Sequence, residues 1–221
     1  MKRVLTSLVT CGLLSCSLAF AVAPENLHIA KERVKQYHDA GTYLKDQQAV
    51  IQLAKRYVLK RVEHNHTTAL PRKLAIVFDI DETALSNYQH MLAYDFGGNH
   101  ALYDQWEGLA DDPAIQPTLD LYKTALRNKV RICFITGRPE KLREKTIRNL
   151  KSAGYTRWNS LSLRQASDKN LSVTAYKTQA RIAIERRGYE IIANIGDQYS
   201  DLNGRHADST FKLPNPFYYI P

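Results

Sequence analysis

Cysteine is scarce in this chain, and its three residues exclude a disulfide framework. Cys11 and Cys16 lie in an N-terminal segment that we expect to be removed, which leaves only Cys133. A single cysteine cannot form an intramolecular disulfide bond. Because Cys133 lies between Ile132 and Phe134 in an apolar run, we interpret its thiol as buried packing in a strand and not as a nucleophile.

The sequence offers no membrane-spanning run at its N-terminus either. The apolar stretch from Val4 to Leu14 is shorter than the roughly 20 residues that cross a bilayer. It follows the charged Met1-Lys2-Arg3 and precedes Ala19-Phe20-Ala21, an order typical of a secretory signal peptide. We therefore predict a signal peptide over residues 1–21 and a periplasmic or secreted protein. As an alternative, Leu13-Leu14-Ser15-Cys16 is similar to a lipobox, which would give an outer-membrane lipoprotein with its lipid anchor at Cys16.

Internal repeats, low-complexity tracts and dense basic runs are also absent. Loss of Lys2 and Arg3 with the leader lowers the formal net charge from +9 to +7, and the remaining basic residues are scattered through predicted helices. This distribution favours small phosphate esters over nucleic acid as partners. With 221 residues, 44% hydrophobic and 24% charged, the chain is typical of one globular domain, here residues 22–221.

The central feature of the sequence is a predicted buried strand that is followed directly by acidic residues. Residues 75–78 form an apolar, β-branched run, and Asp79, Asp81 and Glu82 follow it directly. Such a run is typical of a strand covered on both faces of a parallel sheet, so the strand must end near Asp79. Ligands bind at the carboxyl edge of open α/β sheets, and we expect Asp79 and Asp81 to lie there on one side of the backbone.

Two further strands end in polar residues. Residues 130–135 form an apolar run before Thr136-Gly137-Arg138-Pro139, and a helical pattern follows up to Gly154. A strand, a hydroxyl, a glycine and a helix N-terminus in this order predict a phosphate-binding site. Residues 191–195 form the other strand, which precedes Asp197 and Asp201.

The remaining pattern completes an α/β fold. We predict helices over residues 27–38 and 44–63, both packed on the sheet, another from Pro117 toward Asn128, and short strands at 161–163 and 209–213. Between them, residues 84–116 lose periodicity and carry aromatic side chains, which we interpret as a small insertion beside the active site. These rings are Tyr88, Tyr94, Phe96, Tyr103 and Trp106.

These motifs resemble those of acid phosphatases in subfamily IIIB of the haloacid dehalogenase (HAD) superfamily. Phe78-Asp79-Ile80-Asp81-Glu82-Thr83 is similar to motif I in the branch of class B bacterial enzymes and plant vegetative storage proteins. Thr136-Gly137-Arg138 resembles motif II, Lys177 the motif III lysine, and Gly196-Asp197 with Asp201 motif IV. The resemblance covers about residues 72–221. It implies a Rossmann-like three-layer α/β sandwich with a mainly parallel sheet, N-terminal helices and an insertion after the first strand.

The resemblance also implies a reaction and a set of roles. Asp79 is expected to attack phosphorus as the nucleophile, and Asp81 to serve first as general acid and then as general base. Thr136, Gly137 and Lys177 are expected to hold the phosphate group. A hard cation, Mg²⁺, is expected on Asp79, on the backbone carbonyl of Asp81 and on Asp197, with Asp201 as a metal-site residue in a supporting position.

Three functions remain compatible with these motifs. The first is an Mg²⁺-dependent acid phosphatase that hydrolyses phosphate monoesters, with nucleotides or aryl phosphates as expected substrates because of the aromatic insertion. The second is a storage or binding protein on the same fold without turnover, against which the retained Asp79 argues. The third is a phosphotransferase, in which an acceptor alcohol replaces water at the aspartyl-phosphate.

Overall fold

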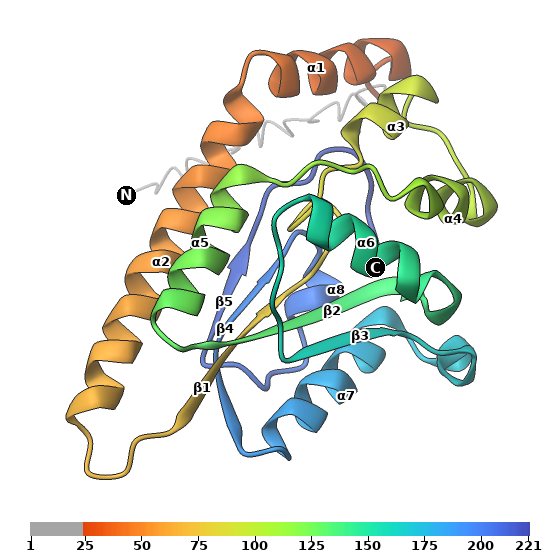
Figure 1. Ribbon diagram of the computed structural model, residues 1–221. Coiled ribbons are helices and arrows are strands. Elements are labelled where there is room, and N and C mark those ends of the chain that lie inside the picture. Colours follow the sequence, from red (N-terminus) through yellow and green to blue (C-terminus); the bar gives the residue numbers. More distant parts are fainter. Residues whose placement is uncertain (1–23) are drawn as a thin grey trace, which may run out of the picture.

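A five-stranded parallel sheet forms the centre of the protein in a computed structural model that describes residues 24–221 (Figure 1). The predicted signal peptide and the two leader cysteines lie outside the described residues. The strands are β1 (Lys73–Phe78), β2 (Arg131–Pro139), β3 (Ser160–Arg164), β4 (Tyr189–Gly196) and β5 (Ser209–Lys212), in the spatial order β3-β2-β1-β4-β5. Strand β1 is therefore central, between β2 and β4.

The order of the strands places a ligand-binding crevice at the centre of the sheet. From β1 the chain proceeds to β2 and β3 on one side, and then crosses to β4 and β5 on the other. Such a reversal leaves a crevice beyond the carboxyl ends of the two strands that flank it, here β1 and β4. Phe78 pairs with Ile195 in the register of these two strands, so Asp79 and Asp197 emerge close together.

Helices cover both faces of the sheet, as the predicted three-layer sandwich requires. They are α1 (Leu27–Asp39), α2 (Thr42–Thr67), α3 (Tyr88–Ala93), α4 (His100–Leu109), α5 (Gln116–Arg127), α6 (Arg143–Ser152), α7 (Val173–Glu185) and α8 (Tyr199–Leu202), with short 3₁₀ helices at Glu140–Leu142 and Ala166–Asn170. In Figure 1, α2 and α5 lie side by side against one face. Within residues 24–221, no helix combines the length and apolar character that crossing a bilayer would need.

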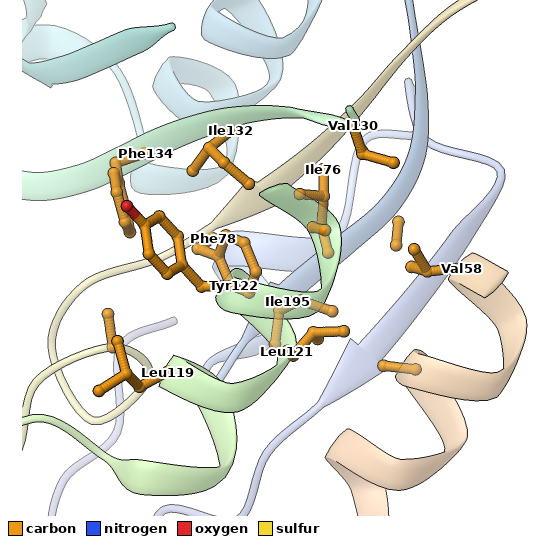
Figure 2. Close-up of a cluster of buried hydrophobic side chains, with 14 of the residues drawn as sticks. Val58, Ile76, Phe78, Leu119, Leu121, Tyr122, Val130, Ile132, Phe134 and Ile195 are labelled. Atoms are coloured by element: carbon orange, nitrogen blue, oxygen red, sulfur yellow. The ribbon is translucent and has the colours of Figure 1, made fainter. Parts of the chain in front are cut away.

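Successive side chains of β1 point to opposite faces of the sheet and pack in two different hydrophobic cores. Ile76 and Phe78 join the larger core under α2, α5 and α6, whereas Ala75 and Val77 join a smaller one under α7. This double burial explains why the strand reads as an unbroken apolar run. Figure 2 shows part of the larger core, where side chains of α5 face those of the strands: Leu119, Leu121 and Tyr122 against Ile76, Phe78, Ile132, Phe134 and Ile195. Cys133 is a free, buried cysteine in β2, as predicted.

Two expectations about the helices were wrong. Residues 84–116 contain two short helices, α3 and α4, where we predicted no regular structure. Helix α3 has only six residues, too few to show a helical period, and α4 begins at a cap in which the Asn99 side chain accepts the Leu102 amide at 3.0 Å. Helix α1 does not cover the sheet with α2. It has no buried residue and packs through Val34 on a separate aromatic cluster.

Candidate active site

The carboxyl ends of β1 and β4, together with α7 and α8, bring three acids and a lysine together. Asp79 follows β1, Asp197 follows β4, Asp201 lies in α8 and Lys177 lies in α7. All four side chains are buried, with 1 to 5% of their surface exposed. Charges so far from water must be paired, because burial without a partner is costly. The sheet topology thus brings Asp79 together with three residues that lie 98 or more positions later in the sequence.

Lys177 links two of the acids directly. Its Nζ donates hydrogen bonds to Asp79 Oδ1 and to Asp201 Oδ1, both at 2.5 Å. Burial lowers the pKa of Lys177, but the carboxylates of Asp201 and Asp79 raise it by a larger amount. The pKa of Lys177 therefore lies above its usual value. Burial, with the charges of Asp201, Asp197 and Asp81, raises the pKa of Asp79 well above the ordinary range even though Lys177 lowers it. One ammonium does not balance this group of carboxylates.

Hydrogen bonds from three side chains hold the carboxylate of Asp197. Its Oδ1 accepts from the Thr83 hydroxyl at 3.1 Å, and its Oδ2 accepts from the amides of Gln198 and Asn215, each at 2.7 Å. Burial and the charge of Asp201 raise the pKa of Asp197 to about 6. A divalent cation would relieve this repulsion.

The three acids also meet the geometric demand of a metal site. One carboxylate oxygen from each of Asp79, Asp197 and Asp201 lies within 4.8 Å of the others. An oxygen-only set of carboxylates at this spacing suits a hard divalent cation. The carboxylate of Asp81 is not part of this group.

Asp81 instead pairs with Arg138, to which we assigned no role from the sequence. The Arg138 guanidinium donates to Asp81 Oδ1 from Nη2 at 2.7 Å and from Nε at 3.0 Å, and its Nη2 also reaches Asp112 Oδ2 at 3.1 Å. The Asn87 amide adds a hydrogen bond to Asp81 Oδ1 at 3.0 Å. Burial raises the pKa of Asp81, but Arg138 and Asn87 outweigh it and hold the pKa below the usual value.

The predicted phosphate-binding stretch differs from its expected local structure. Thr136 and Gly137 lie inside β2, which continues to Pro139, and α6 begins only at Arg143 after a 3₁₀ turn. A helical pattern was expected directly after Pro139, and the structure has the 3₁₀ turn there, so α6 itself begins three residues later than the pattern indicated. Pro139 pairs with Arg164 of β3 after a register shift beyond Ile135. Thr136 is fully buried, and its Oγ1 accepts the Arg138 amide at 3.1 Å while lying 3.4 Å from Asp81 Oδ2.

A pocket of about 410 Å³ opens onto these groups. The acids, Lys177, Gly137 and Arg138 line it, and so do Tyr103, Trp106 and Glu107 of α4. The segment Tyr218–Pro221 also contributes to the wall. Of the five aromatic residues predicted near the active site, only Tyr103 and Trp106 line this pocket. Tyr88 and Phe96 pack with Phe217 elsewhere, and Tyr94 contacts Trp106 away from the pocket.

Other residues that orient the site were missed. Glu82 is fully buried with a φ of 53°, and its carboxylate accepts hydrogen bonds from the backbone N–H of Asn87 at 2.6 Å and from the Tyr218 hydroxyl at 3.0 Å. This arrangement fixes Asn87 against Asp81. The acidic character of Glu82 beside the motif was visible in the sequence. Its partner 136 residues away was not, since only the folded chain brings Tyr218 to it.

Comparisons with known proteins agree with this arrangement. Residues 2–221 match the family model described as HAD superfamily, subfamily IIIB (acid phosphatase). The chain is 37% identical to the stem 28 kDa glycoprotein of Glycine max over 195 residues, which cover 86% of this chain and 74% of the relative. It is 38% identical to acid phosphatase 1 of Solanum lycopersicum over 148 residues, or 65% of this chain and 58% of that protein.

A storage protein and a solved structure are also similar. Vegetative storage protein 1 of Arabidopsis thaliana is 37% identical over 149 residues, 66% of this chain and 55% of the relative. The class C acid phosphatase from Bacillus anthracis has the same fold, with a TM-score of 0.68 and 21% identity over 87% of this chain and 85% of that one. Given the match along nearly its whole length, the chain belongs to the acid phosphatases of HAD subfamily IIIB.

Proposed function

We propose that this acid phosphatase hydrolyses phosphate monoesters through an aspartyl-phosphate formed on Asp79. The observation that carries the proposal is the state of the Asp79 carboxylate at the pocket. Lys177 holds Oδ1 at 2.5 Å, while Oδ2 accepts no hydrogen bond from the described part of the chain. One oxygen is thereby fixed in place and the other remains available for in-line attack on phosphorus.

The reaction then proceeds in two halves. In the first, Asp79 Oδ2 bonds to phosphorus, the bond from phosphorus to the ester oxygen breaks, and Asp81 gives its proton to the departing oxygen. In the second, water attacks phosphorus, Asp81 accepts a proton from it, and the bond to Asp79 breaks to release phosphate. Because Arg138 and Asn87 hold the pKa of Asp81 low, protonating it for the first half requires an acidic medium.

Lys177, Thr136 and Gly137 are the groups proposed to bind the phosphoryl oxygens. Lys177 carries the positive charge, and it lies against the nucleophile. Gly137 lines the pocket, and its lack of a side chain leaves room for the phosphate beside the backbone. The Thr136 hydroxyl lies between Asp81 and the Arg138 amide. Charge-assisted hydrogen bonds from such donors stabilise the negative charge that the phosphoryl group carries during transfer.

HAD phosphatases generally use a divalent metal, and residues 24–221 contain an aspartate group that fits one. We propose Mg²⁺, held by Asp79, the backbone carbonyl of Asp81 and Asp197. The Asp201 carboxylate accepts hydrogen bonds from Lys177 Nζ at 2.5 Å and from the backbone N–H of Gln198 at 2.8 Å. These two contacts support a positioning role for Asp201. When bound, the cation neutralises charge shared by the carboxylates and the phosphate.

Aromatic side chains support a preference for nucleotide or aryl esters. Trp106 is only 3% exposed, because His90, Tyr94 and Tyr103 surround its ring. Tyr103 is more exposed and lines the pocket, so it is the ring best placed to stack on a leaving group. Stacking of a base contributes about 1 to 3 kcal/mol. Tyr103→Ala should therefore lower the aryl-to-alkyl ratio of kcat/KM, whereas Tyr94→Ala should not.

The storage function finds partial support in the vegetative storage protein among the relatives. The retained Asp79, held by Lys177 at the pocket, favours catalysis, because a carboxylate in this position is able to attack phosphorus. A phosphotransferase would share the same intermediate. Glycerol added as an acceptor separates the two reactions, since transfer yields glycerol phosphate in place of free phosphate.

Export from the cytoplasm is part of the proposal and depends on residues 1–21. Mass spectrometry of the mature N-terminus should find cleavage after Ala21. A diacylglyceryl group on Cys16 would instead establish the lipoprotein.

The central test is Asp79→Asn, assayed by phosphate release from p-nitrophenyl phosphate, nucleotides and sugar phosphates. The amide keeps the size of the side chain but does not attack phosphorus, so the rate should fall by more than about 10³-fold. In the wild type, acid-quenched samples should contain one phosphoryl group on the peptide with Asp79. Asp120→Asn, on the exposed face of α5, is the matched control. Near-full activity of Asp79→Asn would exclude the proposed nucleophile.

A further inference from the structure

Glu107 is a carboxyl group in the pocket wall without a partner. It lies in α4 beside Trp106, and it lines the pocket together with Asp81 and Arg138. Within residues 24–221 its carboxyl group forms no hydrogen bond or ion pair, and its Oε2 is buried. Nearby acids differ in this respect, because Asp112 accepts from Arg138 at 3.1 Å and Asp104 pairs with Lys141.

Such a group is costly to keep, which indicates that it serves a ligand. A buried polar atom without a hydrogen bond loses the hydration it had in the unfolded chain. Burial, and next the negative charge of Asp81, raise the pKa of Glu107 to about 8. Below that pH the side chain is a neutral carboxylic acid, which both donates and accepts a hydrogen bond. In this state it does not repel an incoming phosphate ester.

The position of Glu107 identifies the part of the substrate that it meets. A general acid must lie within hydrogen-bond reach of the oxygen that it protonates, so the alcohol half of the ester lies beside Asp81. Glu107, Asp81 and Arg138 line the same pocket, so the two carboxyl groups face the same bound ester. The phosphoryl group, by contrast, is drawn to Lys177 on α7. Glu107 therefore faces the alcohol close to its ester bond.

Contacts outside the pocket hold helix α4, and with it Glu107, in place. Lys141 pairs with Asp104 on this helix, and the Arg148 guanidinium donates to the Leu109 carbonyl at 3.2 Å. Tyr103 and Glu107 are four residues apart and thus lie on the same face of α4. A ring and a carboxyl group on one face suit a leaving group that has both a flat ring and hydroxyl groups.

We infer that Glu107 determines specificity by hydrogen bonding to a hydroxyl group on the carbon next to the ester carbon, so that ribonucleoside 3′-monophosphates and sugar 1-phosphates are preferred over esters of simple alcohols. This inference rests on the proposed phosphatase mechanism, and it adds the chemical class of the alcohol. It concerns binding of the leaving group and involves no further covalent step.

The test compares two substrates that differ by one hydroxyl group. Adenosine 3′-monophosphate carries a hydroxyl next to the ester carbon, and 2′-deoxyadenosine 3′-monophosphate lacks it. The wild type should prefer the first by about tenfold in kcat/KM, the value of one good hydrogen bond. Glu107→Leu should bring this ratio close to one, and Glu107→Gln, which still donates and accepts, should retain part of it. Gln105→Leu on the exposed face of α4 is the control and should keep the wild-type ratio.

Two results would overturn the inference. One is a ratio that is the same in the wild type and in Glu107→Leu, and the other is a ratio near one in the wild type itself. Turnover of p-nitrophenyl phosphate, which has no hydroxyl of this kind, tests the phosphatase mechanism separately through Asp79→Asn. Melting temperatures of the two Glu107 variants show whether both are folded. If Glu107→Leu is unfolded, the ratio is measured in Glu107→Gln, which keeps the shape of the side chain.

Discussion

Replacing Arg138 by methionine tests whether its buried guanidinium holds the site together. Arg138 is 1% exposed and donates three hydrogen bonds to Asp81, at 2.7, 3.0 and 3.2 Å, and one to Asp112 at 3.1 Å. Methionine fills much of the same space but pairs with neither acid. The variant would leave two carboxyl groups without their cation, and Asp112 is itself 3% exposed.

The expected loss of stability follows from this burial. Removing one partner of a buried ion pair costs about 3 to 5 kcal/mol in the free energy of unfolding. With an m-value of about 2 to 3 kcal/mol per molar urea, the unfolding midpoint should fall by about 1 to 2 M. The control is Arg61→Met, which breaks partly exposed pairs with Glu190 and Asp208 and should cost about 1 kcal/mol or less.

The pH dependence of the loss gives a sharper readout. Because the folded pKa of Asp81 lies below its unfolded value, its pairing stabilises the protein above about pH 4 and is lost as pH falls through the folded pKa. Burial raises the pKa of Asp112 to about 6 even though Arg138 lowers it, so Asp112 becomes neutral in mild acid. The difference in unfolding free energy between wild type and Arg138→Met should therefore be largest near pH 7 and shrink toward pH 4.

Urea unfolding followed by tryptophan fluorescence at several pH values measures this difference. Adding Asp112→Asn to Arg138→Met removes one of the unpaired charges and should recover about 1 kcal/mol or more. The reasoning is refuted if Arg138→Met costs less than about 1 kcal/mol at pH 7. It is also refuted if the cost is the same at pH 4, because the loss would then come from packing and not from charge.

Three further predictions concern catalysis and the metal. Asp81→Asn should lower kcat/KM more for alkyl esters than for p-nitrophenyl phosphate, whose leaving group needs little protonation, and equal losses would argue against Asp81 as the acid. EDTA should abolish turnover and added Mg²⁺ restore it, with Asp197→Ala raising the Mg²⁺ concentration needed; full activity after exhaustive chelation would exclude the site. A methyl group at Gly196 would lie 2.5 Å from Asp201 Cβ, so Gly196→Ala should lower both activity and melting temperature. Gly108→Ala meets no atom within 4 Å and should not, and equal melting temperatures for the two variants would contradict the clash.

Much of the candidate active site was predictable because its residues follow strands that are easy to recognise. The runs before Asp79 and Asp197 are apolar because both faces of β1 and β4 are covered. An acidic residue directly after such a run indicates where the strand ends. Parallel strands direct their carboxyl ends to one edge, so the meeting of these two acids followed from the pattern. The resemblance to known motifs added Lys177, whose position in the sequence carries no signal of its own.

Residues outside these motifs were not predictable in the same way. Asp112 and Glu107 come from the segment between β1 and β2, where short helices give no clear period and acids are common on the surface. Arg138 belonged to a recognised motif, yet its pairing with Asp81 depends on the direction in which its side chain leaves β2. Its strand continues to Pro139, which pairs with Arg164 of β3 after a register shift beyond Ile135.

Local sequence patterns were enough to predict the α/β fold and to place Asp79 and Asp197 at strand ends, because apolar runs mark buried strands and parallel strands end at one edge of the sheet. Which acids are paired and which have no partner depends on tertiary packing. Lys177 and Arg138 each come from another element and pair with a particular carboxylate, whereas no side chain of the described residues forms a hydrogen bond with Glu107. Pairing depends on distances of a few ångströms between distant segments, and these distances exist only once the sheet and its helices have packed.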